Sequence, residues 1–142
     1  MTHANHPATI RRLLTTPATW AVVGLSANTE RVAYGVAAFV RDRLGMRIVP
    51  VNPRGESWEG ERGYVRLADV PGPIDVVDCF VNSSRVGDVV DDAIAERERL
   101  GIGAVWLQLG VIDESAADRA QSAGLDVVMD TCPAMEGPAL GL

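Results

Sequence analysis

Short apolar runs alternate with longer amphipathic stretches along most of the chain. The runs are four to seven residues long, which is typical of strands buried on both faces of a parallel sheet. They predict strands at residues 20–25, 46–51, 75–81, 104–109 and 126–129. Apolar residues three and four apart predict helices at residues 8–15, 32–44, 83–100 and 114–123.

This alternation predicts an α/β fold, a doubly wound five-stranded parallel sheet with helices on both faces. Right-handed crossovers favour the strand order 3-2-1-4-5. The length of 142 residues suits one domain, residues 1–142, with residues 1–6 as a flexible tail. A short tail is expected to follow the last strand and its turn at residues 130–133.

The turn after the first strand has the composition of an anion site. Gly24 allows a sharp turn at the end of the apolar run, and a helix whose buried face includes Val32 follows. Three side chains are expected to cap that helix: Ser26, Asn28 and Thr29. Free N–H groups at a helix start attract anions, so we interpret Ser26 as a cap that contacts a phosphate.

In doubly wound sheets, ligands bind beyond the carboxyl ends of the strands, at the switch point beside strand one. The turns that would meet there are residues 24–31, 50–54, 82–85, 108–111 and 130–133. Residues 55–63 are polar and glycine-rich, which predicts an exposed loop carrying Trp58.

The charge and the basic residues narrow the choice of partner. The net charge is −6, which disfavours a nucleic-acid partner. All thirteen basic residues are arginine, which excludes lysine Schiff-base or phosphate-loop chemistry.

No apolar run approaches the roughly 20 residues of a membrane span, and the first residues show no secretory pattern, so we expect a cytoplasmic protein without a membrane partner. In that compartment Cys79 and Cys132 are expected to be free thiols.

Side chains for catalysis or metal binding are scarce. The two histidines, His3 and His6, lie in the expected tail, which argues against a metal site and against a Ser-His-Asp hydrolase. Asp75 and Asp78 fall on opposite faces of a strand, so we interpret them as capping or packing residues. Cys132 is the one candidate nucleophile; a helix start there would lower its pKa, but the nearby carboxylates Asp130 and Glu136 would raise it, and no base accompanies it.

The first turn reads Gly24-Leu25-Ser26 and lacks the further glycines of a dinucleotide fingerprint. The second strand ends in Asn52-Pro53-Arg54, where an NAD site carries Asp or Glu. Arg54 suits a phosphate instead, either that of NADP or that of another phosphorylated adenosine such as coenzyme A.

Five motifs in register resemble a known family. They are Gly24-x-Ser26, Tyr34-x-Val36-Ala37, Pro50-Val51-Asn52-Pro53, Trp106-Leu107-Gln108-x-Gly110 and Asp130-x-Cys132-x-x-x-Glu136. From about Thr15 to the end, the chain is similar to the small standalone CoA-binding proteins, relatives of the CoA-binding domain of the succinyl-CoA synthetase α subunit. The resemblance implies a Rossmann-like domain that binds coenzyme A across its switch point.

The resemblance also implies the binding residues. They are Gly24, Ser26, Ala27, Arg31, Val51, Asn52, Pro53, Arg54, Asn82, Ser83, Arg85, Gln108 and Gly110. The chain departs from the family at Val81 and Thr131, where members often carry arginine. Arg31, Arg54 and Arg85 are the residues that would compensate for the two arginines.

We therefore expect a protein that binds coenzyme A or an acyl-CoA without catalytic machinery of its own, because the ligase relatives transfer phosphate through a histidine. An NADP-binding oxidoreductase or sensor is the first alternative. An interaction protein that has lost its ligand is the second, suggested by Val81 and Thr131. A homodimer or a protein partner is compatible with each hypothesis.

Overall fold

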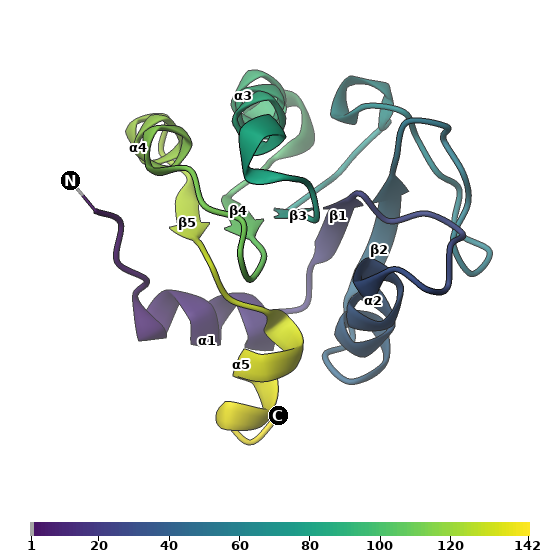
Figure 1. Ribbon diagram of the computed structural model, residues 1–142, viewed down its shortest axis with the longest axis horizontal. Helices are drawn as coiled ribbons and strands as arrows, with labels where there is room; N and C mark the ends of the chain where they lie inside the picture. Colours follow the sequence, from purple (N-terminus) through teal and green to yellow (C-terminus); the bar gives the residue numbers. More distant parts are fainter. Residues whose placement is uncertain (1) are drawn as a thin grey trace.

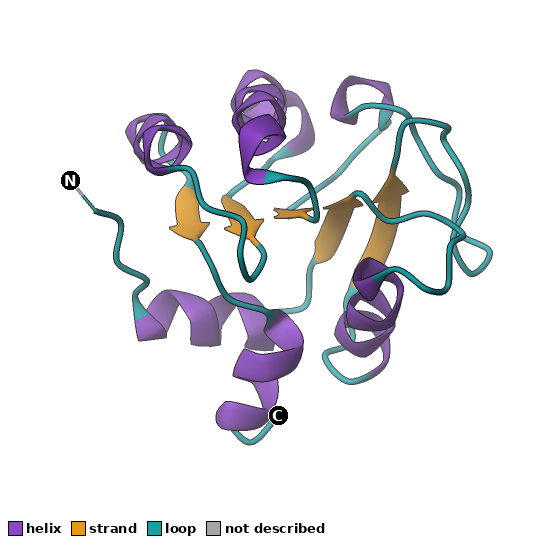
Figure 2. Ribbon diagram, in the orientation of Figure 1, coloured by secondary structure: helices purple, strands orange, loops and turns teal. Residues whose placement is uncertain are grey.

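The computed structural model describes residues 2–142, which form a five-stranded parallel sheet covered by helices on both faces (Figures 1 and 2). The strands are β1 (Thr19–Val23), β2 (Arg47–Val51), β3 (Val76–Cys79), β4 (Ala104–Leu107) and β5 (Asp126–Val128). The helices are α1 (Pro7–Thr15), α2 (Val32–Asp42), α3 (Ser83–Leu100), α4 (Glu114–Ser122) and α5 (Pro133–Ala139), with a short 3-10 turn η1 at Leu67–Asp69. The α/β class and the parallel five-stranded sheet are confirmed.

The predicted strand order is wrong. The observed order is β2-β1-β3-β4-β5, so β3 pairs with β1 and β2 lies at an edge. Pro50 explains this arrangement, because its carbonyl faces away from β1 and accepts from the amide of Tyr64 at 3.0 Å. A further strand on that side would meet a residue without an N–H, so β2 suits an edge. The chain reverses direction across the sheet between β1 and β3, which makes that pair the switch point.

Two apolar cores lie on opposite faces of the sheet. On one face α3 and α4 cover Ala21, Val77 and Val105. On the other face α1, α2 and α5 cover Trp20 and Trp106, whose ring centroids are 5.7 Å apart. All four residues of β3 are buried, as expected for a strand inside a parallel sheet.

Helix α2 begins at Val32 as predicted, but its buried face differs from the prediction. Val32, expected in the buried face, is 73% exposed, and the helix packs through Ala33, Val36, Ala37 and Val40. The N-cap residue is Arg31, which makes no capping bond with its side chain. Helix α5, where a short tail was expected, buries Pro133 and Gly137.

The loop of residues 55–63 is largely exposed, as predicted, but Trp58 within it is buried. Trp58 is 1% exposed; Tyr34 of α2 packs edge-on against it, and the Arg41 guanidinium lies 4.7 Å from its ring centroid. Glu59 accepts hydrogen bonds from the Tyr34 hydroxyl and from Arg41. Helix α2 therefore holds this loop in place through the buried ring of Trp58, because burial of a large aromatic side chain is strongly stabilising.

The first residues contact the body of the domain. The Asn5 side chain donates to the Met129 carbonyl at 2.8 Å and accepts from the Met129 amide at 2.9 Å, although residues 1–6 were expected to form a flexible tail. Met1 of that segment lies outside the described residues. Within residues 2–142, the helices are too short or too polar to cross a bilayer.

Candidate functional site

A hollow of about 840 Å³ lies beyond the carboxyl ends of β1, β2 and β3. Of the thirteen predicted binding residues, nine line it: Gly24, Ser26, Arg31, Val51, Asn52, Pro53, Arg54, Asn82 and Arg85. Its position at the β1–β3 switch point is where doubly wound sheets bind ligands. The volume falls within the roughly 300–1,000 Å³ of small-molecule sites.

Gly24 makes the turn after β1 from a backbone that no other residue fits. Its φ is 100°, and its amide donates to the Val51 carbonyl at 2.8 Å. A Cβ at this position would lie 2.2 Å from the Phe80 carbonyl oxygen, well inside contact distance. The turn therefore passes directly over the end of β3, and the hollow opens above it.

The polar side chains of this turn shape the turn rather than cap α2. Ser26 Oγ accepts from the Asn28 amide at 3.2 Å, and Asn28 Oδ1 accepts from the Glu30 amide at 3.0 Å. The expected capping of α2 by Ser26, Asn28 and Thr29 is therefore wrong, because the N-cap residue is Arg31 and these three residues lie further before the helix start at Val32. Ser26 and Asn28 nevertheless line the hollow.

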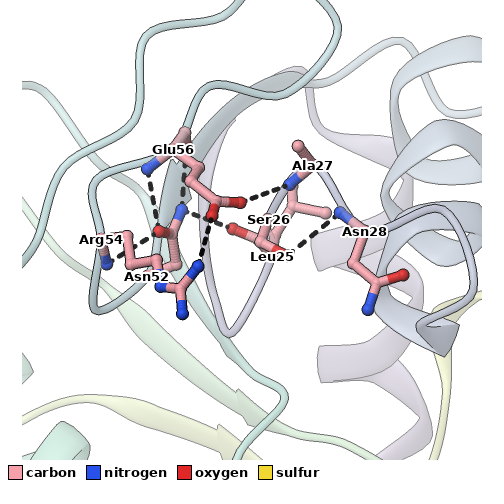
Figure 3. Close-up of polar contacts among 7 residues, drawn as sticks. All are labelled: Leu25, Ser26, Ala27, Asn28, Asn52, Arg54 and Glu56. Atoms are coloured by element: carbon pink, nitrogen blue, oxygen red, sulfur yellow. Dashed lines mark hydrogen bonds and ion pairs between the residues drawn. The ribbon is translucent and has the colours of Figure 1, made fainter.

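Asn52 is a structural clamp at the end of β2. Its side chain is buried and donates to the carbonyls of Leu25 and Glu56, both at 2.9 Å, while its oxygen accepts from the amides of Arg54 at 3.1 Å and Glu56 at 2.9 Å (Figure 3). These four bonds use the carboxamide fully. Asn52 thus fixes the wall of the hollow and has no donor left for a ligand.

Glu56 is a site residue that the sequence reasoning missed. Its Oε2 accepts from the Ala27 amide at 3.3 Å, and its Oε1 lies 3.9 Å from an Arg54 nitrogen (Figure 3). Ala27 itself was predicted to bind ligand and is not among the lining residues. The signal for Glu56 was its position four residues after Asn52. Because residues 55–63 were predicted only to form an exposed loop, Glu56 was not among the predicted site residues.

The third turn divides between the hollow and the neighbouring loop. Asn82 caps α3, its Oδ1 accepting from the Ser84 amide at 2.9 Å, and it lines the hollow together with Arg85. Ser83 instead donates to the Gly110 carbonyl at 3.2 Å and accepts from the Ile112 amide at 3.0 Å. Ser83 and Gly110 thus meet each other, outside the lining of the hollow.

Gln108, also predicted to bind ligand, is buried outside the lining of the hollow. Its Nε2 donates to Asp78 Oδ1 at 2.5 Å, and the other oxygen of Asp78 has no partner within residues 2–142. Burial raises the pKa of Asp78 to about 7, against the smaller opposing effect of the Gln108 hydrogen bond. Gln108 therefore donates to a buried carboxyl group, which agrees with the interpretation of Asp78 as a packing residue.

Neither cysteine has the environment of a nucleophile. Both thiols are free, as expected, and both are buried. Cys132 is the N-cap residue of α5, and burial is the largest effect on its thiol and raises its pKa. Thr131 donates to Glu136 at 2.7 Å. The residues 2–142 contain no group of His, Cys, Asp and Glu arranged to hold a metal ion.

The charges around the hollow are mixed. Arg31, Arg54 and Arg85 lie in its lining, and the side chain of Arg54 is 86% exposed. Glu56 and Asp88 also line it. Val81, Val89, Val65 and Phe80 provide an apolar part of the wall. The hollow therefore combines charged and apolar surface, as small-molecule sites do.

Known proteins resemble this chain in sequence and in structure. A family described as a CoA binding domain matches residues 18–138. The uncharacterized protein YneT of Bacillus subtilis (strain 168) is 30% identical over 125 residues, covering 88% of this chain and 89% of that protein. A hypothetical protein from Pyrococcus horikoshii OT3 has a similar structure, with a TM-score of 0.86, 31% identity and full coverage of both chains.

A larger protein matches over a shorter segment. The α subunit of acetate–CoA ligase (ADP-forming) II of Pyrococcus furiosus is 30% identical over 56 residues, which are 39% of this chain and 12% of that subunit.

Proposed function

The chain belongs to the CoA binding domain family, and we propose that it binds coenzyme A or an acyl-CoA in the hollow at the ends of β1, β2 and β3. The observation that carries the proposal is the convergence of Arg31, Arg54 and Arg85 on the hollow beside the turn at Gly24. Guanidinium groups and turn amides are the donors that phosphates prefer.

The fold supports an assignment of the ligand's parts. The pyrophosphate would lie at the turn of residues 24–31, where Arg31 and the first turn of α2 offer positive charge. Arg54, beyond the end of β2, would bind the phosphate on the adenosine ribose. Val65, Val81 and Val89 would contact flat, apolar parts of the ligand.

Val81 and Thr131 stand at two positions where family members often carry arginine, so this chain has less positive charge there. Thr131 donates a hydrogen bond to Glu136 at 2.7 Å and is absent from the lining of the hollow. Val81 lies in the lining. We therefore expect only the difference at Val81 to affect affinity.

We propose a binding protein and not an enzyme. Within residues 2–142 the histidines are His3, next to Gln121 of α4, and His6, the N-cap of α1, and neither lines the hollow. Phosphotransfer of the kind that the ligase relatives perform would need such a group at the site.

Isothermal titration calorimetry tests the proposal. Coenzyme A, acetyl-CoA, NADPH and NADP⁺ are titrated separately into the purified chain. Saturable heats with coenzyme A or acetyl-CoA, at lower concentration than with either nicotinamide nucleotide, are expected. Tighter binding of NADPH would favour the NADP alternative, which shares Arg54. Absence of heat with every ligand at millimolar concentration would contradict the proposal.

A further inference from the structure

The carboxylate of Glu56 lies on the turn that the proposed function assigns to the ligand's pyrophosphate. Glu56 Oε2 accepts from the Ala27 amide at 3.3 Å, and Glu56 Oε1 lies 3.9 Å from Arg54 (Figure 3). A turn amide and a guanidinium are the two kinds of donor that a phosphate would use. One protein carboxylate therefore engages both of them.

The backbone of Glu56 is fixed from two sides. Asn52 accepts from its amide and donates to its carbonyl, both at 2.9 Å. Gly63 packs so closely that a Cβ there would lie 1.9 Å from the Glu56 carbonyl oxygen. The side chain is consequently directed at the turn of residues 24–31 by the fold of the loop, rather than lying there by chance.

The side chain itself is free to move. It is 35% exposed, and the contacts of its carboxylate within residues 2–142 are the long ones to Ala27 and Arg54. An anion arriving at the turn would be repelled by Glu56 and attracted by Arg31, Arg54 and Arg85. Rotation of Glu56 toward solvent removes the repulsion and releases both donors.

We propose that Glu56 is a specificity-determining residue, an internal anion that a ligand phosphate must displace from the turn. The inference rests on the proposed function for the identity of the ligand. It deepens that function because displacement favours a ligand with several adjacent phosphate charges over a monovalent anion. A carboxylate that instead accepted a ribose hydroxyl would have the opposite effect on affinity.

The test compares wild type with E56Q, which keeps the shape and the backbone bonds of the residue and removes its charge. E61Q is the matched control, since Glu61 is exposed in the same loop, outside the lining, and makes the same change in net charge. Inorganic pyrophosphate and coenzyme A are titrated into each protein by calorimetry. The Ala27 amide resonance is followed by NMR, and thermal unfolding verifies that each variant is folded.

E56Q is expected to bind pyrophosphate and coenzyme A about tenfold more tightly than wild type, and E61Q to change either affinity by less than about twofold. Pyrophosphate should shift the Ala27 amide. Equal affinities in all three proteins, weaker binding by E56Q, or no pyrophosphate binding by any protein would overturn the inference.

The two proposals can fail separately. If E56Q strengthens pyrophosphate binding while coenzyme A binds to none of the proteins, the role of Glu56 stands and the proposed function fails. If coenzyme A binds equally to all three proteins, the proposed function stands and the role of Glu56 is overturned.

Discussion

Asn52 donates a hydrogen bond to the Leu25 carbonyl at 2.9 Å and thereby joins the loop after β2 to the turn after β1. Both segments line the hollow, and one buried carboxamide thus holds them together. Its other bonds hold Arg54 and Glu56 in the same loop. The geometry of the hollow therefore depends on a residue that presents no free polar group to it.

Asn52→Ala is expected to lower the free energy of unfolding by about 2–4 kcal/mol, because it leaves several backbone groups without partners. Asn28→Ala, in an exposed turn with one side-chain acceptor bond, should cost below about 1 kcal/mol. Urea denaturation of both variants measures the difference. Equal losses would show that Asn52 is not the clamp described here.

Gly24→Ala should destabilise the domain by more than backbone strain alone. Gly45→Ala is the matched control, since Gly45 also has a positive φ, 74°, but open space around its Cβ position. The control should cost about 1 kcal/mol, and Gly24→Ala at least about 3 kcal/mol, because its Cβ would meet the Phe80 carbonyl. Thermal unfolding gives both values. Similar values for the two would contradict the close approach of the turn to β3.

Asp78 makes stability depend on pH. Its pKa is raised from 3.8 to about 7 by burial, so between these values the folded state binds more protons than the unfolded state. The contribution of Asp78 is therefore complete below about pH 4 and is lost as the pH rises through 7, with a slope of up to about 1.4 kcal/mol per pH unit.

Asp78→Asn isolates this effect from that of the other carboxylates. The gain in stability of the variant over wild type should be larger at pH 8 than at pH 4, by a few kcal/mol, because asparagine is never charged. Urea denaturation at several pH values measures the difference. A gain that does not change with pH would mean that Asp78 keeps an ordinary pKa.

The arginines of the hollow should each contribute to ligand affinity. Replacement of Arg31, Arg54 or Arg85 by glutamine is expected to weaken coenzyme A binding about fivefold, a modest effect because these side chains are exposed. Arg11→Gln, on the exposed side of α1, is the control and should leave affinity unchanged. Calorimetry at two salt concentrations measures both, and the losses should shrink at high salt. Equal effects of Arg11 and the other three would point to net charge alone.

Much of the architecture could be predicted because local patterns determine it. The apolar runs identify the five strands. Asn82 and Asp113, of residue types that favour N-caps, cap α3 and α4, each accepting from a backbone amide. The family resemblance drawn from five short motifs is confirmed by the match over residues 18–138.

What could not be predicted depends on long-range packing. Strand order depends on which edges pair, and the feature that favours β2 at an edge is a single residue, Pro50, whose carbonyl faces the outer side of that strand. Trp58 belongs to a polar stretch whose burial requires Tyr34 and Arg41 from α2. Glu56 reaches the first turn only because Asn52 folds the loop back toward Leu25.

Binding of coenzyme A in the hollow is tested most directly by an NMR titration of the isotopically labelled chain with coenzyme A. We predict saturable changes concentrated at the amides around the hollow, above all Gly24, Ser26, Ala27 and Asn82. Changes should be small at the amino ends of the strands, near Thr16 and Gly103. Changes centred elsewhere, or none at millimolar coenzyme A, would contradict this prediction.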